Sequence, residues 1–411
     1  MADILDVYNP ISYDESVSHY EVHSYIPYNT TRFENNDEIR ITIQHQELNV
    51  LPCESSIHIT GKICLRTDES KKVAKTTLVN NGICQLFEQI RYELNGVEID
   101  RCKRVGLTSI MKGWASMNPQ KEECLMNSGW IDIRETKSIV IEKGVFDVNI
   151  PLKMILGFAE DYKKIIINCR HELVLTRAHN DDSALVFTGE ANGNIEDSKI
   201  KIDKIEWLVP HVQLSNEYKI RMLRQLERQK PIKMAFRSWE LYEYPMLPPT
   251  DSHVWNVKTS NQLEKPRYAI IGFQTNRNGR RNNSSQFDSC DLTNVRLYLN
   301  ATYYPYANLN LNIAENQYAL LYEMFCKFQH SYYGKESEPA ISRGHYIGHM
   351  PLVVIDCSKQ NDSLKNAPVD VKVELQSKKS FPANTAAYCL LLHDRVVEYN
   401  PSTGDVRLSV A

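Results

Sequence analysis

The sequence predicts a mostly β protein built from two tandem β-sandwiches, and three observations support this fold class. Apolar and polar residues alternate in segments 38–44, 199–205 and 371–375, as in strands with one buried and one solvated face. Tyrosines outnumber phenylalanines 22 to 11, and together with β-branched residues they crowd these segments, as pleated strands favour. Segments in the two halves of the 411-residue chain also resemble each other in the same order.

Short turns separate the expected strands. Asn95-Gly96 lies between two alternating segments, which is a strong signal for a two-residue hairpin. Long helices do not alternate with strands along the chain, so the pattern is not that of a parallel sheet.

The internal similarity suggests where one copy ends and the next begins. Residues 90–96 match 295–301, and a helical stretch follows each, at 107–117 and 315–328. The other matches are 57–63 with 268–274, Pro151-Leu152 with Pro351-Leu352, and 171–175 with 371–375. We predict two jelly-roll β-sandwiches of about 200 residues each. The N-terminal one, 1–212, carries an N-terminal arm, and the C-terminal one is 213–411.

A helix is expected just after this boundary. Ser215 is a suitable N-cap and Pro231 a suitable stop. Within the helix, the apolar residues are expected to face inward, namely Ile220, Leu223 and Leu226.

Composition excludes several classes of protein. The chain has 48 basic and 51 acidic residues, a net charge of −3, which argues against a protein built mainly to coat nucleic acid. No run of about 18 apolar residues predicts a membrane-spanning helix. The first residues are acidic where a secretory signal needs basic ones, so we expect the chain to stay inside the cell. Its ten cysteines form no Cys-x-x-Cys pair, which favours buried reduced thiols over zinc ligands.

Motifs for chemistry are scarce. His19 and His23 lie four residues apart, about 13 Å in a strand, too far to share one metal. His345 and His349 have the same spacing, but the neighbouring glycines indicate a loop. There is no nucleophile elbow and no phosphate-binding loop. We therefore predict no catalytic residues, no metal site and no cofactor, although a pair of carboxylates acting as in a glycosidase stays open.

Two basic clusters are candidate contact residues. The first, with Arg277, Arg280 and Arg281, lies in a polar, turn-rich segment that we interpret as an exposed loop. It could face a packaged genome or an acidic neighbour, or simply be solvated. The second lies on one side of the helix after Ser215, where Glu217 can pair with a residue four positions later, and it consists of Arg221, Arg224 and Arg228. A subunit contact suits this helix better than DNA, since no aromatic residues that could stack on bases are interleaved with either cluster.

The first eighteen residues contain four acidic positions and show no periodicity. They predict an arm that orders against neighbouring subunits, or else a frayed terminus.

Several stretches resemble one family of proteins. They are 149–153 (NIPLK) with 157–162 (GFAEDY), 205–210 (IEWLVP), 236–241 (FRSWEL), 265–268 (KPRY) with 272–275 (GFQT), and 304–306 (YPY) with 308–310 (NLN). In this order they are similar to the double jelly-roll major capsid proteins of Polinton-like elements, adintoviruses and related DNA viruses. The resemblance covers roughly positions 85–395. None of these stretches is a chemical motif.

The resemblance implies a structural role. It implies two tandem jelly rolls with short helices in the loops, and a homotrimer whose six jelly rolls form a pseudo-hexagonal tile of an icosahedral shell. The implied partners are the chain itself, neighbouring capsomers and a separate vertex protein, with packaged DNA only weakly supported. The implied location is the virion, assembled in the host cytoplasm or nucleus. At 411 residues the chain resembles compact members, so long tower loops should be absent.

Physical arguments agree with this role but leave alternatives. Two similar lobes per chain give six lobes in a three-fold trimer, and near-neutral charge suits packing against many copies. A double β-sandwich that binds carbohydrate or a receptor is the main alternative, with Trp255 or Tyr303 in its site. A jelly-roll metal enzyme is the second.

Overall fold

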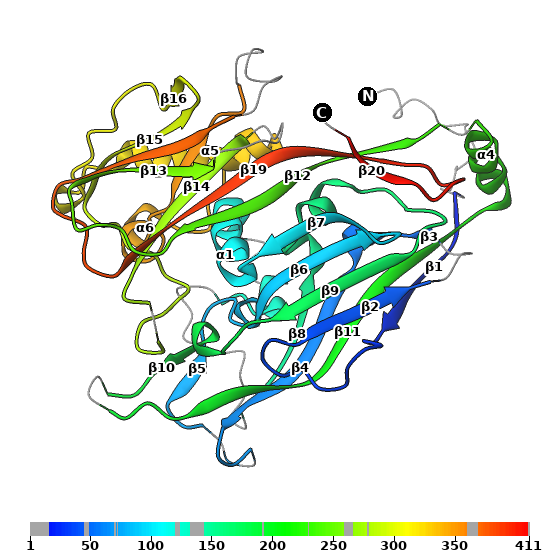
Figure 1. Cartoon of the computed structure of the whole chain (residues 1–411), viewed down its shortest axis with the longest axis horizontal. Helices are drawn as coiled ribbons and strands as arrows, with labels where there is room; N and C mark the ends of the chain where they lie inside the picture. Colours follow the sequence, from blue (N-terminus) through cyan, green and yellow to red (C-terminus); the bar gives the residue numbers. More distant parts are fainter. Residues whose placement is uncertain are drawn as a thin grey trace, which may run out of the picture.

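The computed structural model of the chain describes residues 16–44, 49–69, 71, 73–119, 124–131, 144–190, 193–228, 230–258, 266–277, 279–359 and 369–409. Its main strands form two β-sandwiches that lie side by side and are connected through one helix (Figure 1). We call β1 to β11 the first sandwich and β12 to β20 the second. No helix in these described ranges is long and apolar enough to cross a membrane.

The first sandwich has two main sheets, of orders β1-β11-β4-β8 and β2-β9-β6-β7. The short β3 also pairs with β11, and β5 pairs with β10. The strands are β1 (Val17–Tyr25), β2 (Glu38–Ile43), β3 (Asn49–Val50), β4 (Ser56–Leu65), β5 (Thr76–Leu78), β6 (Phe87–Leu94), β7 (Val97–Lys103), β8 (Val145–Pro151), β9 (His171–Arg177), β10 (Leu185–Phe187) and β11 (Ser198–Leu214).

The second sandwich repeats this arrangement, with sheet orders β12-β19-β14-β17 and β13-β18-β15-β16. One additional strand, β20, pairs with β19. The strands are β12 (Ile232–Tyr244), β13 (Ser252–Lys258), β14 (Pro266–Thr275), β15 (Leu292–Leu299), β16 (Thr302–Tyr304), β17 (Val353–Asp356), β18 (Val371–Ser377), β19 (Thr385–Tyr399) and β20 (Val406–Ser409). The predicted fold class, two tandem jelly-roll sandwiches in a mostly β chain, is confirmed.

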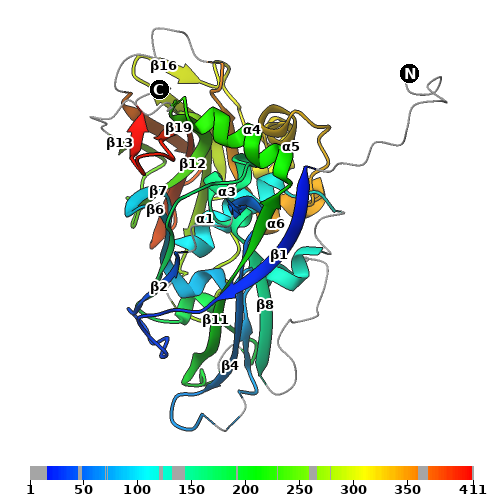
Figure 2. The ribbon, with the colours of Figure 1, turned by 90° about the vertical axis from the view of Figure 1, so that its right-hand side faces the viewer.

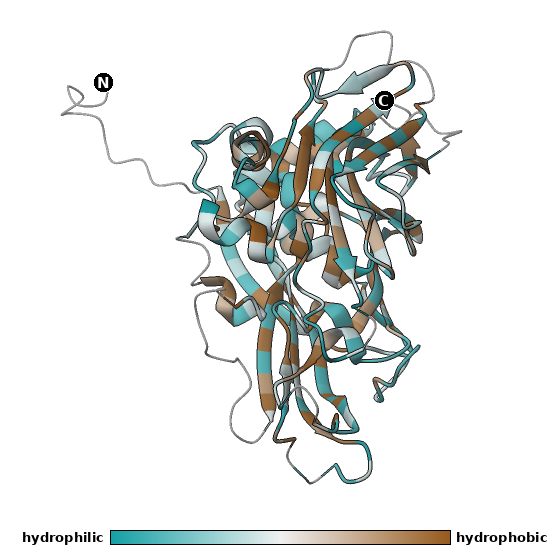
Figure 3. Cartoon of the chain, turned by 90° about the vertical axis from the view of Figure 1, so that its left-hand side faces the viewer, coloured by the Kyte–Doolittle hydropathy of each residue, from teal (hydrophilic) through white to brown (hydrophobic). Residues whose placement is uncertain are grey.

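The two copies also pair their strands in the same register. Ile90 lies opposite Leu175 in the first sandwich, and Val295 lies opposite Leu375 in the second. These are the positions that the sequence comparison matched, because 90–96 corresponds to 295–301 and 171–175 to 371–375. Alternating apolar and polar bands along the strands are visible in Figure 3, and this period of two fixes which face is buried.

One of the sequence matches is wrong. Pro151 is the last residue of β8, whereas Pro351 comes before β17 begins. The two strands occupy equivalent places beside β4 and β14, but their Pro-Leu pairs do not. A dipeptide is too short to fix a strand register.

The predicted hairpin at Asn95-Gly96 is confirmed as the turn between β6 and β7. Both residues have positive φ, 49° and 80°, the combination that a two-residue turn of this type requires and that Asn-Gly adopts readily. Asn300 has φ 54° at the corresponding turn between β15 and β16.

Each sandwich contributes residues to the hydrophobic core of the other. The first helix, α1 (Val105–Ser116), follows β7 of the first sandwich, yet its Ile110 and Trp114 pack in the core of the second. Conversely, Phe236 of β12 and Tyr399 of β19 belong to the core of the first. Figure 1 shows β12 and β19 reaching across the first sandwich, with α1 near the boundary. The helix expected at 315–328 is α5 (Ala319–Tyr333).

The connecting helix, α4 (Asn216–Leu226), differs from its prediction. Ser215 is at its N-cap as expected, but the helix ends well before Pro231, and it has no buried residue. Ile220 and Leu223 are 51% and 48% exposed and Leu226 is only half-buried, so the expectation that all three face inward is wrong. No described segment of the chain packs over these side chains and buries them.

The predicted division between residues 212 and 213 falls inside β11, which ends at Leu214, and it stays a proposal for how the chain divides. Of the predicted N-terminal arm, 1–18, residues 1–15 lie outside the described ranges. Val17 and Ser18 are already part of β1.

Candidate functional site

A buried lysine connects the two sandwiches at their junction, which comprises α1, α3 (Gly157–Asp161), β12 and α5. Lys112 of α1 contacts both carboxylate oxygens of Glu160 in α3, at 3.0 and 3.1 Å, and the hydroxyl of Tyr333 in α5 at 2.9 Å. Its side chain is 3% exposed. Burial lowers the pKa of Lys112, and Glu160 opposes that shift. A charge so far from water is tolerable because it is paired and fully hydrogen-bonded.

An arginine on the second sandwich completes the junction. Arg237 of β12 grips Asp161 of α3 with two donors, at 2.8 and 2.6 Å, and donates to the carbonyl of Tyr332 at 2.7 Å. Its guanidinium also lies 3.4 Å from the ring centroid of Tyr332. This two-pronged geometry fixes orientation as well as distance.

Asp100 ties three elements together in the same region. Its Oδ1 accepts a hydrogen bond from the Ser238 hydroxyl of β12 at 2.6 Å, and its Oδ2 accepts one from the Phe158 backbone of α3 at 2.9 Å. Burial raises the pKa of Asp100, and these hydrogen bonds oppose the rise. The carboxylate therefore acts as a buried linker between β7 and both partners.

The backbones of the two sandwiches approach closely at Gly157. A Cβ atom at this position would lie 1.8 Å from the carbonyl oxygen of Arg237. Since real Cβ contacts are not this short, glycine is required where α3 meets β12.

The two stretches that form this contact, 157–162 and 236–241, are among those that carry the resemblance described above. Sequence reasoning used them for recognition and missed their role. One signal was available for Lys112, because it is the single charged residue in the otherwise uncharged helix 105–116. A charged residue in a helix whose other side chains carry no charge is expected to be buried, and a buried charge needs a partner of opposite charge.

The loop with the first basic cluster forms a second contact between the sandwiches, and at Arg280 the interpretation of an exposed, available cation is wrong. Arg280 is 7% exposed. It pairs with Asp182 at 2.8 Å and donates to the hydroxyl and the carbonyl of Ser198 at 2.7 and 2.8 Å. Because its donors are used within the chain, it is not the free cation that an exposed loop would offer.

The other two arginines of the loop are more accessible. Arg277 pairs with Asp288 of its own sandwich at 2.8 Å. Arg281 is exposed and donates to the carbonyl of Gly193 at 3.2 Å. The loop thus acts mainly as a clasp onto the first sandwich.

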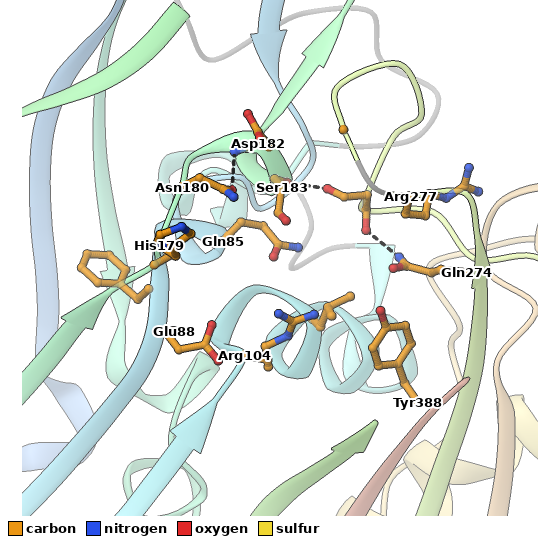
Figure 4. A pocket seen from close by; sticks show the side chains of 15 residues that line it. Gln85, Glu88, Arg104, His179, Asn180, Asp182, Ser183, Gln274, Arg277 and Tyr388 are labelled. Carbon is orange, nitrogen blue, oxygen red and sulfur yellow. Dashed lines mark hydrogen bonds between the residues drawn. The ribbon is translucent and has the colours of Figure 1, made fainter. Parts of the chain in front are cut away.

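A polar cavity of about 420 Å³ lies beside this clasp, between the two sandwiches (Figure 4). Its labelled lining residues from the first sandwich include Glu88, Arg104 and His179, and those from the second include Gln274 and Tyr388. Within the described part of the chain, no hydrogen bond joins His179 to the neighbouring Asp182 or Ser183. Arg104 lies 3.3 Å from Glu243 and Arg277 pairs with Asp288, so the charge of each lining arginine is balanced by a nearby carboxylate. Among the described residues that line the cavity, no hydrogen bond pairs a serine hydroxyl with a histidine, as a nucleophile and its base would be.

The second basic cluster lies only partly on the helix where the sequence placed it, because α4 ends at Leu226 and Arg228 follows it. All three arginines are exposed: Arg221 lies in the middle of α4, Arg224 in its last turn and Arg228 just after it. The expected pair between Arg221 and Glu217 forms, at 2.5 Å. In the described ranges no ion pair engages Arg224 or Arg228.

Neither histidine pair forms part of a metal cluster among the described residues. His19 and His23 are in β1 and both contact Glu21 between them, at 3.2 and 2.7 Å. His345 and His349 lie in the helix α6 (Arg343–His349), so the expected loop is wrong. Glycine lowers helix propensity only modestly, and tertiary packing of the buried Tyr346 decides here.

The two aromatic residues suggested for a carbohydrate site, Trp255 and Tyr303, lie in different environments. Trp255 is 5% exposed and packs in the second core. Tyr303 stacks on Tyr306 at 5.7 Å with an interplanar angle of 8°, and Tyr306 is 85% exposed.

Comparison with known proteins identifies the family to which this fold belongs. The sequence profile of the double jelly roll-like domain matches residues 76–397, which is most of the chain. The chain belongs to the double jelly roll-like domain family. A search of curated protein sequences finds no significant match.

Solved structures share the fold of this family member at low sequence identity. The capsid protein in the quasi-atomic model of the PBCV-1 virus capsid has a TM-score of 0.63 at 10% identity, with 98% of this chain and 99% of that chain covered. The Sputnik virophage structure gives 0.61 at 10%, covering 99% and 92%. The mavirus major capsid protein gives 0.56 at 10%, covering 98% and 92%. The chain therefore shares the double jelly-roll fold of these capsid proteins.

Proposed function

We propose that this protein is the major capsid subunit of a DNA virus or of a virus-derived genomic element. The observation that carries the proposal is the repeat of one sheet order and one strand register in two sandwiches that a buried junction holds at a fixed angle. A rigid block with two similar lobes is suited to geometric assembly. The double jelly-roll family and the capsid structures with the same fold support this reading.

The proposed assembly is a homotrimer that presents six lobes as a pseudo-hexagonal tile, with tiles joining into an icosahedral shell. Contacts that do not close within one trimer can extend into a larger surface. Placement near Polinton-like elements or adintoviruses, location in the virion, and a separate vertex protein belong to the same proposal.

Mass and particle shape test this proposal together. Light scattering after size-exclusion chromatography should give about 143 kDa, three chains of 47.5 kDa, and electron microscopy should show triangular or hexagonal particles or closed shells. A protein that stays monomeric at high concentration and under all assembly conditions would contradict the proposal.

Carbohydrate binding is a second candidate, favoured by the exposed Tyr306, which stacks on the half-buried Tyr303. Flat exposed rings suit the apolar faces of sugars. A glycan array in which binding disappears in Tyr306→Ala would support it. Trimers that bind no glycan would favour the capsid role over carbohydrate binding.

A further inference from the structure

The connecting helix α4 has a surface that the described part of the chain leaves open. Ile220 and Leu223 are about half exposed, and Tyr218 is 41% exposed. Figure 2 shows the helix on the outside of the molecule, near the start of β1. An isolated helix of this length is marginal in water, so an apolar edge of this kind is best explained by a partner.

The charge around that edge defines the chemistry of the partner. Residues 215–230 contain five basic residues (Lys219, Arg221, Arg224, Arg228 and Lys230) and two acidic ones, Glu217 and Glu227, a net charge of +3. Only one of the arginines is paired, Arg221 with Glu217, among the described contacts. A complementary segment would carry carboxylates alternating with apolar side chains.

Residues 1–15 of this chain have that composition. They contain four acidic residues and no lysine, arginine or histidine, and their apolar residues include Ile4, Leu5 and Ile11. The acidic residues are Asp3, Asp6, Asp14 and Glu15.

The direction of the strands brings this segment to α4. β1 and β11 are antiparallel, with Val17 opposite Leu214, and the Ser215 backbone donates to the carbonyl of Ser16 at 3.0 Å. The chain therefore enters β1 at the same end of the sheet from which β11 leads into α4. Fifteen residues can reach about 50 Å, whereas the eleven residues of α4 span about 16 Å.

We propose that residues 1–15 dock along α4 of the same chain, with Asp14 and Glu15 near its first turn and apolar residues against Ile220 and Leu223. The acidic pair then lies at the positive end of the helix dipole. The short tether gives a high effective concentration, which favours the chain's own helix over that of another copy. The proposal rests on these surfaces and not on the capsid role.

The test uses a labelled peptide of residues 1–15 and a protein that lacks them. Fluorescence anisotropy should show saturable one-to-one binding of the peptide to the truncated protein, weakening as salt rises. The full-length protein should bind the peptide at least tenfold more weakly, because its own segment occupies the site. Equal binding to both proteins, or none to either, would overturn the proposal.

Charge reversal locates the contact. In the truncated protein, the triple change Arg221→Glu, Arg224→Glu and Arg228→Glu should weaken peptide binding at least tenfold. The matched control is Lys327→Glu, since Lys327 and Glu323 form an exposed i,i+4 pair on α5 at 2.5 Å. Binding that survives the triple change, or is lost in the control, would place the contact elsewhere.

A second measurement is independent of peptide affinity. Hydrogen exchange of the α4 amides should be slower in the full-length protein than in the truncated one, while exchange in β18 stays unchanged. A lipid surface is the competing partner for a basic amphipathic helix. If the truncated protein binds phosphatidylcholine vesicles containing phosphatidylserine, and the peptide fails to compete, the docking proposal is wrong.

Discussion

The two sandwiches share a strand order and a register, but equivalent positions in β6/β9 and β15/β18 hold different chemistry. The first sandwich buries Tyr92 and His171, joined by a hydrogen bond of 2.6 Å. The register places Leu297 and Val371 at the same sites of the second sandwich, both buried. One topology is thus stabilised by a polar pair in one copy and by aliphatic packing in the other.

The end of the same strand shows a larger difference. Arg177, the last residue of β9, is fully buried and pairs with Asp181 at 2.9 Å, both side chains being 1% exposed. Ser377 ends β18 at the equivalent place. The fold therefore depends on the alternating pattern and not on particular residues, while at this position only the first sandwich has a buried ion pair.

Removing the partner of Arg177 should have the largest effect. Asp181→Ala leaves a buried guanidinium unpaired, which costs about 3–5 kcal/mol, whereas Ser377→Ala should cost below about 1 kcal/mol. Urea unfolding with hydrogen exchange in β9 and β18 would measure both. Equal losses in the two variants would mean that the contrast between the copies has no energetic meaning.

Acid should destabilise the first sandwich through His171. Burial, with a smaller contribution from His211, lowers the pKa of His171 to about 3. Below its ordinary value of about 6.5, the unfolded chain takes up a proton that the folded protein does not, so stability falls as the pH drops towards 3. The loss from this residue is about 1.4 kcal/mol per pH unit, or about 2 kcal/mol at pH 5.

The equivalent residues of the second sandwich provide a control variant for that prediction. Tyr92→Leu with His171→Val installs the residues of the second sandwich, and the pH dependence of unfolding between 6.5 and 4 should become shallower by this amount. An unchanged slope would show that His171 is not neutral in the folded protein.

The junction is where the two copies stop being independent. Gly157→Ala forces a Cβ against the Arg237 carbonyl, and overpacking of this kind costs about 1–3 kcal/mol. The matched change is Gly344→Ala in α6, where nothing lies within 4 Å of the new atom, so stability should hold or rise slightly. We expect Gly157→Ala to separate the unfolding of the two sandwiches, which differential scanning calorimetry would detect as two transitions.

The smallest effect on stability is expected at α4. Arg224→Glu changes an exposed side chain with no ion pair in the described ranges, so the unfolding free energy should change by less than about 0.5 kcal/mol. A larger loss in urea unfolding would show that the helix is part of the folded core.

The strand pattern could be predicted from sequence because a period of two and turn residues such as Asn95-Gly96 are local signals. The junction could not, since Lys112 and Glu160, or Arg280 and Asp182, lie far apart in the chain and no local pattern connects them. The faces of α4 were misassigned for a different reason. An amphipathic helix shows that one side is covered, but periodicity does not say whether the cover comes from the body of the protein.

The junction has a kinetic consequence for any closed ring made from this chain. In a ring of six lobes built by three molecules, half of the lobe-to-lobe neighbours are already fixed by Arg237, Lys112 and their carboxylates before any encounter in solution. Three bodies, instead of six, then lose translational and rotational freedom. Nucleation of such a ring therefore becomes a third-order event, and its rate should stay appreciable at protein concentrations where separate single lobes would fail to associate.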